Sequence, residues 1–199
     1  MSELPSDSKR IRARLRRYER QLRAEKSRTG YVDDGAGLRF LVGPLYLLLG
    51  DLAGAAKSFA WFEEQFPDDG GEPGNDLCWA LVLYRIGSQE AATRKLRQVM
   101  LRNLYLLPRL LGVPRKPLSI WHGSNWAEAD YLACIPPQYW ELWEADALGW
   151  ARILYESEAF RKAESRYIAI YKELRTLPPG PRRSALVHEA RLLDRNGSI

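Results

Sequence analysis

The chain has 199 residues, 46% of them hydrophobic, and a formal net charge of +5, which predicts one globular domain or one short helical array with an apolar core. No apolar stretch is long enough to span a bilayer, and the first ten residues lack the hydrophobic segment of a signal peptide. The two cysteines, Cys78 and Cys134, are too few for a disulfide framework, so we expect a reducing, cytoplasmic location.

The N-terminal segment, residues 1–29, is predicted to be a basic helix from residue 7 onward. Residues 1–30 carry ten basic and four acidic side chains, so the positive charge of the chain is concentrated here. Apolar residues recur in it at spacings of four, three and four, typical of a narrow apolar seam on a helix. The seam consists of Ile11, Leu15, Tyr18 and Leu22, and the basic residues beside it include Arg10, Arg14 and Arg17.

Three interpretations of this helix are open. Its seam can cap the helices that follow, with the arginines in solvent. It can instead pair with a partner helix or with a second copy of the chain, giving a homodimer. The basic face can also bind phosphates of nucleic acid or acidic lipid, although Tyr18 is its only aromatic residue for stacking on bases.

Residues 36–69 carry the pattern of two antiparallel helices joined by a tight turn. Small residues provide places where two helix backbones can approach closely, and large residues lie beside them. A Gly-Asp pair separates the helices, a proline ends the second, and Asp33 or Asp34 is a suitable N-cap for the first. The pattern residues are Gly43, Tyr46, Gly50-Asp51, Ala55, Phe59 and Pro67.

This spacing resembles that of a tetratricopeptide repeat. Arg39 departs from the motif, which usually has Trp there, and Phe62 stands where a small residue is usual. Two further copies are predicted over residues 73–106 and 144–177. The second keeps the spacing with Ala80, Gly87, Ala92 and Leu96, and the third with Ala151, Leu154, Ala163 and Tyr167. The resemblance implies an all-α, right-handed array of helical hairpins within a single domain over residues 30–199.

Residues 107–143 do not follow the repeat and are expected to form an irregular insertion. Prolines enforce an extended crossing, Ser124 or Asn125 is the expected cap of a new helix, and Pro136-Pro137 is expected to start the next. That last helix should carry one apolar stripe, made of Trp140, Trp143, Ala147, Trp150 and Leu154. A final helix over residues 181–195 is expected to cap the array.

The segment from Asn103 to Tyr131, which overlaps this insertion, resembles one that follows the repeats in tetratricopeptide proteins similar to the suppressor-of-tumorigenicity family, and the whole resemblance covers roughly residues 37–145. The resemblance supports the architecture and implies no activity. Its residues include Asn103, Tyr105, Pro108, Leu110-Leu111-Gly112, Gly123-Ser124, Glu128-Ala129 and Tyr131.

No motif for catalysis, metal binding or a cofactor is present in the sequence. His122 and Ser124 are the nearest to a base beside a nucleophile, but side chains two residues apart rarely reach each other productively. The chain has no phosphate-binding glycine loop and no paired zinc cysteines. We therefore expect a protein that is not an enzyme and needs no cofactor.

The repeat resemblance implies a concave face formed by the first helix of each pair, where partners usually bind. The predicted concave-face residues are Phe40, Leu47, Leu77, Leu81, Tyr84, Arg85, Leu148, Arg152 and Tyr155. This mostly apolar set suits an amphipathic helix or extended peptide. The expected function is that of a protein-binding adaptor, and the alternative is a nucleic-acid-associated adaptor acting through the N-terminal arginines. The concave face can also be filled by the chain itself, through the basic helix or the insertion.

Overall fold

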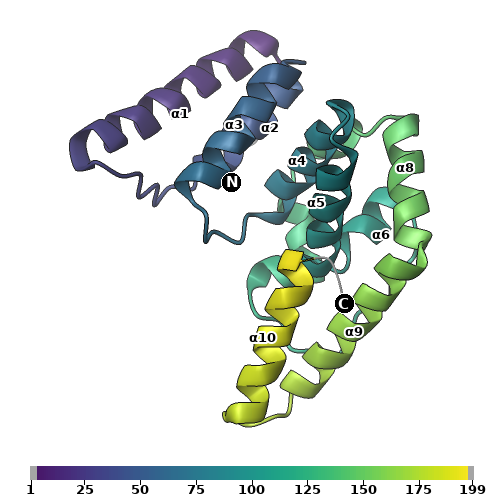
Figure 1. Ribbon diagram of the computed structural model, residues 1–199. Helices are drawn as coiled ribbons and strands as arrows, with labels where there is room; N and C mark the ends of the chain where they lie inside the picture. Colours follow the sequence, from purple (N-terminus) through teal and green to yellow (C-terminus); the bar gives the residue numbers. More distant parts are fainter. Residues whose placement is uncertain (1–3, 197–199) are drawn as a thin grey trace. The chain divides into compact units, whose positions relative to one another are not determined.

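The computed structural model describes residues 4–196, with side chains to residue 194, and every regular element in this range is a helix (Figure 1). The all-α prediction is therefore confirmed. No helix in the described range is long and apolar enough to cross a membrane. The elements are α1 (Ser8–Thr29), α2 (Arg39–Leu48), α3 (Leu52–Gln65), α4 (Pro73–Arg85), α5 (Gln89–Arg102), α6 (Leu106–Leu111), η1 (Asn125–Ala127), η2 (Ala129–Cys134), α7 (Pro137–Glu141), α8 (Ala145–Glu156), α9 (Glu158–Leu174) and α10 (Pro181–Asn196).

The chain divides into two compact units, where the sequence predicted one domain after the basic helix. Unit 1 consists of Met1–Ala92 and Pro136–Leu142, and unit 2 of Thr93–Ile135 and Trp143–Ile199. The N-terminal helix belongs to unit 1, and a short piece of the predicted insertion joins it there.

Helix α1 begins at an aspartate cap and packs on α2 in unit 1 (Figure 1). The Asp7 carboxylate accepts hydrogen bonds from the backbone N–H groups of Lys9 and Arg10, and Gly30 ends the helix in a left-handed conformation. All four seam residues are buried within their own chain. The seam therefore has the position expected of a cap, and pairing of this helix with a second copy stays a prediction.

Helices α2 and α3 form the predicted hairpin by close approach at a glycine. A Cβ atom added to Gly43 would lie 2.5 Å from Cε1 of Phe59, so only glycine fits this place without a shift of the ring. The ring of Phe59 is in turn stacked on Trp79 of α4, with centroids 5.2 Å apart. The small and large positions read from the sequence are thus in contact in the structure.

An aspartate and an arginine fix the start of α2. The Asp34 carboxylate accepts hydrogen bonds from the backbone N–H groups of Leu38 and Arg39, both at 2.8 Å. The guanidinium of Arg39 donates to Asp34 and to Asp69, at 3.0 and 2.9 Å, and lies over the ring of Phe40. Arg39 therefore forms an ion-paired link between the loop before α2 and the loop after α3.

Helix α7 packs against both α2 and α4 in unit 1. Tyr139 is its buried anchor, and the Gln138 side chain donates a hydrogen bond to the carbonyl oxygen of Leu4. Directly after the helix, the carbonyl oxygen of Leu142 accepts a hydrogen bond of 2.7 Å from Arg85 of α4. Part of the predicted insertion thus completes the first unit.

Unit 2 contains the packed pairs α6–α8, α8–α9 and α9–α10. Asn103 is fully buried and organises the segment after α5. Its amide nitrogen donates to the backbone carbonyl groups of Trp126 and Glu128, and its amide oxygen accepts from the N–H of Tyr105. Arg102 pairs with Asp194 of α10 at 3.2 Å.

Two local predictions for the insertion were wrong. Ser124 caps no α-helix, because the residues after it form the short 3-10 turns η1 and η2 and its side chain makes no capping hydrogen bond. The apolar stripe that starts at Trp140 is also interrupted, since α7 ends at Glu141 and α8 begins at Ala145 after the extended residue Glu144. Periodicity alone did not reveal this break.

Candidate functional site

The structure places four predicted concave-face residues in the interior. Phe40 and Leu47 of α2 and Leu77 and Leu81 of α4 are at most 8% exposed. These two helices pack on each other and on α7, so the chain's own segment occupies their surroundings. This corrects the expectation of an open groove at these positions and agrees with the alternative of a self-filled face.

The remaining predicted concave-face residues are partly accessible, and three of them, Arg85, Arg152 and Tyr155, are hydrogen-bonded within their own unit. Tyr84 and Arg85 are half-buried in unit 1. In unit 2, Leu148 and Tyr155 are half-buried, and the exposed Arg152 donates a hydrogen bond of 2.7 Å to the carbonyl oxygen of Leu111. Burial raises the pKa of Tyr155, and its hydroxyl lies 3.3 Å from Nη1 of Arg115. Arg85 and Arg152 each bind a backbone carbonyl, so neither is positioned primarily for a ligand.

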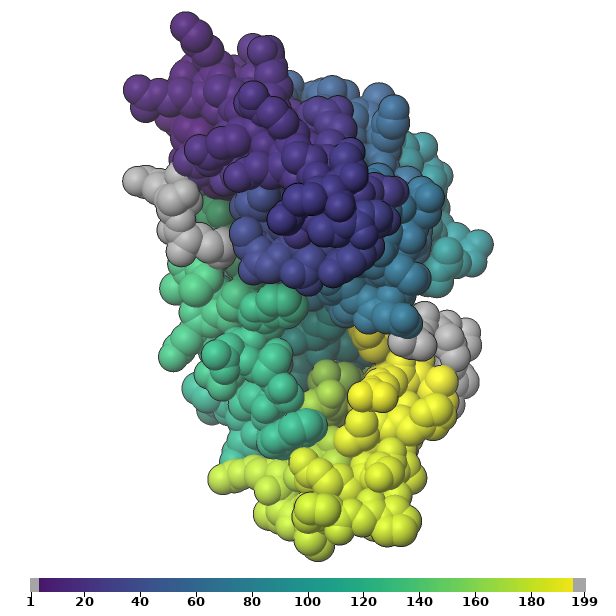
Figure 2. Space-filling model, turned by 90° about the vertical axis from the view of Figure 1, so that its left-hand side faces the viewer, coloured from purple at the N-terminus to yellow at the C-terminus, as the bar shows by residue number. Residues whose placement is uncertain are grey.

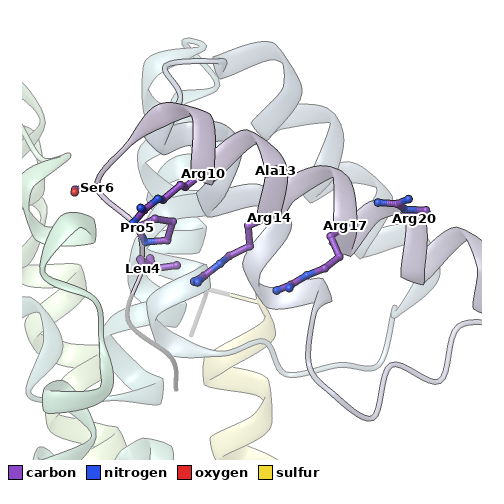
Figure 3. A pocket seen from close by; sticks show the side chains of 8 residues that line it. All are labelled: Leu4, Pro5, Ser6, Arg10, Ala13, Arg14, Arg17 and Arg20. Carbon is purple, nitrogen blue, oxygen red and sulfur yellow. The ribbon is translucent and has the colours of Figure 1, made fainter.

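The arginines of α1 line an open hollow of about 730 Å³ (Figure 3). Arg10, Arg14 and Arg17 extend from one side of the helix, as their spacing requires, and Leu4 and Pro5 close one end. The guanidinium of Arg17 lies 5.2 Å from the ring centroid of Tyr18. In the space-filling view the side chains of α1 project from the surface (Figure 2). We call this surface the arginine face.

A second hollow, of about 440 Å³, lies between α1 and α3 over α2, and we call it the α1–α3 hollow. Its lining residues on α1 and on α3 are mostly three or four positions apart, so on each helix they lie on the one face that borders the hollow. Sequence reasoning missed it, although the spacing of small residues among larger ones on α3 could have indicated it. Its lining is Glu19, Leu22, Arg23 and Lys26 of α1, Val42 and Tyr46 of α2, and Gly54, Lys57, Ser58 and Trp61 of α3.

Hydrogen bonds fix the walls of the α1–α3 hollow. The Tyr46 hydroxyl donates to Glu19 at 2.5 Å, and burial together with this carboxylate raises the pKa of Tyr46 to about 12. The Lys26 ammonium donates to the side-chain oxygen of Gln65 at 2.7 Å and links α1 to α3. The Tyr46 ring approaches α3 closely at Gly54, where a Cβ atom would be 2.4 Å from the ring.

A buried polar cluster at the start of α4 has a structural role. The Glu72 carboxylate accepts hydrogen bonds from the backbone N–H groups of Gly74 and Asn75, but burial still raises its pKa to about 7. The neighbouring Cys78 is fully buried, and burial raises its thiol pKa well above the ordinary value. Such a thiol is a poor nucleophile and cannot be reached by a substrate.

The described residues show no arrangement suited to metal binding, because no three His, Cys, Asp or Glu side chains among them converge. His122 is half-buried and Ser124 is exposed in the loop before η1. No protein-family model, curated protein or solved structure matches the chain. The resemblance to tetratricopeptide repeats thus stays a prediction that depends on the residues themselves.

Proposed function

We propose that the chain is a protein-binding module, without catalytic activity, built from tetratricopeptide-like hairpins in a right-handed array. The first predicted repeat supplies a packed hairpin, α2–α3 in unit 1. In the third, α8 and α9 are in contact in unit 2, but α9 continues roughly in the direction of α8 and the two do not fold back on each other (Figure 1). The close contact between Gly43 and Phe59 supports the repeat interpretation, because it joins the small and large positions of the motif.

The observation that carries the proposal is the α1–α3 hollow, an open, partly apolar surface held by a packed helical scaffold. Rigid helices that present apolar side chains in a concave surface are a common way to bind a peptide or a helix of another protein. The hollow replaces the concave face as the proposed contact surface in unit 1. Both cysteines are free thiols, which suits a reducing compartment such as the cytoplasm.

Selection of peptides from a random display library tests this function without knowledge of the natural partner. We expect the immobilised full chain to enrich peptides that then bind in solution with dissociation constants on the order of 10 µM. An unrelated helical protein of similar charge provides the control. Enrichment no stronger than on that protein would overturn the proposal.

A second candidate function is the binding of nucleic acid along the arginine face. Four arginines, Arg10, Arg14, Arg17 and Arg20, line one hollow on α1, and such clusters attract phosphates. Fluorescence anisotropy with a short duplex and a single strand should then show affinity that falls steeply between about 50 and 200 mM salt. Arg17→Glu should weaken this binding, whereas an affinity independent of salt would exclude the second candidate.

A further inference from the structure

We infer that the α1–α3 hollow binds an acidic segment of a partner protein that inserts one bulky apolar side chain between the two helices. This inference rests on the proposed protein-binding function and adds the chemistry of the partner.

The floor of the hollow is apolar and has room for a side chain. Leu22 and Val42 lie at its base and are each 5% exposed, and the half-buried rings of Tyr46 and Trp61 form its sides. Because Ser58 is small, α3 leaves space beside these rings, and Gly54 makes room for the Tyr46 ring itself. A volume of about 440 Å³ exceeds what one aromatic or branched side chain needs and lies within the range of ligand pockets.

The rim of the hollow is cationic. Arg23, Lys26 and Lys57 surround the floor, and Arg23 and Lys57 are exposed. Two carboxylates lie near the rim. Glu19 accepts the Tyr46 hydrogen bond and lies 3.8 Å from Arg23, and Asp51, beside Gly54, accepts a hydrogen bond from the Gly54 N–H. Three cations against two carboxylates that are both hydrogen-bonded within the chain leave a positive excess at the rim, which complements carboxylates on the bound segment.

An acidic peptide fits these features better than a nucleic acid does. Phosphates bind to cations, and contact with the aliphatic side chains of Leu22 and Val42 adds little to their affinity. An apolar side chain of a peptide is removed from water by contact with Leu22 and Val42, which favours its binding. The only tryptophan at the hollow, Trp61, packs edge-on against Phe66, with ring centroids 5.9 Å apart. The apolar floor therefore favours a peptide, and competition with a duplex is included in the test.

The test uses a fluorescent peptide of about ten residues with a central Leu-Phe pair flanked by Glu and Asp. The full chain should bind it, and replacing the peptide's Phe with Ala should weaken binding about tenfold or more because the side chain loses its buried site. Sodium chloride should also weaken binding through screening of the rim.

Lys57→Glu is the decisive variant, because this lysine is exposed and its replacement leaves the packing of α3 in place. It should weaken binding about fivefold or more by reversing one charge at the rim. Ser58→Leu should block the hollow from within and gives a second, uncharged perturbation. Lys116→Glu, at an exposed lysine of unit 2, is the matched control and should leave the affinity unchanged. Circular dichroism confirms that each variant is folded.

Several outcomes would overturn the inference. Unchanged affinity in Lys57→Glu and Ser58→Leu would show that the peptide binds elsewhere. Equal binding of the peptide with Ala in place of Phe would show that charge attraction alone holds the peptide and that no apolar side chain enters the hollow. Displacement of the peptide by a duplex whose own binding needs Lys57 would assign the hollow to nucleic acid. If display selection instead yields tight neutral or basic peptides while the acidic peptide fails, only this inference is lost, whereas the protein-binding function fails if no peptide binds.

Discussion

Replacing Gly43 with alanine tests the close approach of α2 and α3 that defines the hairpin. In an exposed helix interior, alanine is more favourable than glycine by about 1 kcal/mol. Here the new Cβ atom would lie 2.5 Å from the ring of Phe59, which cannot move freely because it is stacked on Trp79. Overpacking of this kind costs about 1–3 kcal/mol, and the following residue, Pro44, further disfavours a helical residue with a Cβ atom.

We therefore expect Gly43→Ala to lower the free energy of unfolding by up to about 2 kcal/mol, against the gain that helix propensity alone predicts. Urea unfolding followed by circular dichroism measures this difference. Ala60→Gly, at an exposed position inside α3, is the control for propensity in the same hairpin and should cost about 1 kcal/mol. A stabilised Gly43→Ala would refute the close contact, because it would show that the ring leaves room for a methyl group.

Three further predictions concern polar groups of the fold. The first concerns Glu72, whose pKa is raised to about 7 in the folded protein. Its protonated side chain stabilises the fold below about pH 4.5, and this contribution, at most about 3 kcal/mol, is lost as the pH rises to about 7. Glu72→Gln should flatten this pH dependence of the free energy of unfolding, measured in urea. Asp34→Ala should cost about 2 kcal/mol in thermal unfolding, since it removes two backbone hydrogen bonds and one of the two ion-pair partners of Arg39, whereas replacing the exposed Asp33 in Asp33→Ala should cost less than about 0.5 kcal/mol. Asn103→Leu should cost about 2–4 kcal/mol by leaving three backbone groups without their bonds, and a loss below about 1 kcal/mol in urea unfolding would contradict this role.

The sequence predicted the elements that depend on local patterns. The positions of Gly43, Phe59 and the turn at Gly50-Asp51 gave the α2–α3 hairpin, because helix packing and chain reversal there involve residues close in sequence. The apolar spacing from Ile11 to Leu22 likewise identified the buried face of α1. The spacing did not say which segment covers that face. In the structure the face is buried by the chain itself, with α1 packed on α2.

The rest depends on contacts between distant residues that no periodicity encodes. The position of α7 in unit 1 depends on the burial of Tyr139 and on the hydrogen bond from Arg85 to Leu142. The burial of Phe40 could not be read from its repeat position, because the repeat specifies a face and not what fills it. The α1–α3 hollow requires α1 to lie beside the hairpin, which only the folded structure shows (Figure 1).

Amide hydrogen exchange with and without a saturating acidic peptide is the most direct test of binding in the α1–α3 hollow. We expect slower exchange in α1 around Glu19 and Lys26 and in α3 between Gly54 and Trp61, and no change in α8, α9 or α10. Protection confined to unit 2, or no protection in either unit at saturation, would contradict the proposed site.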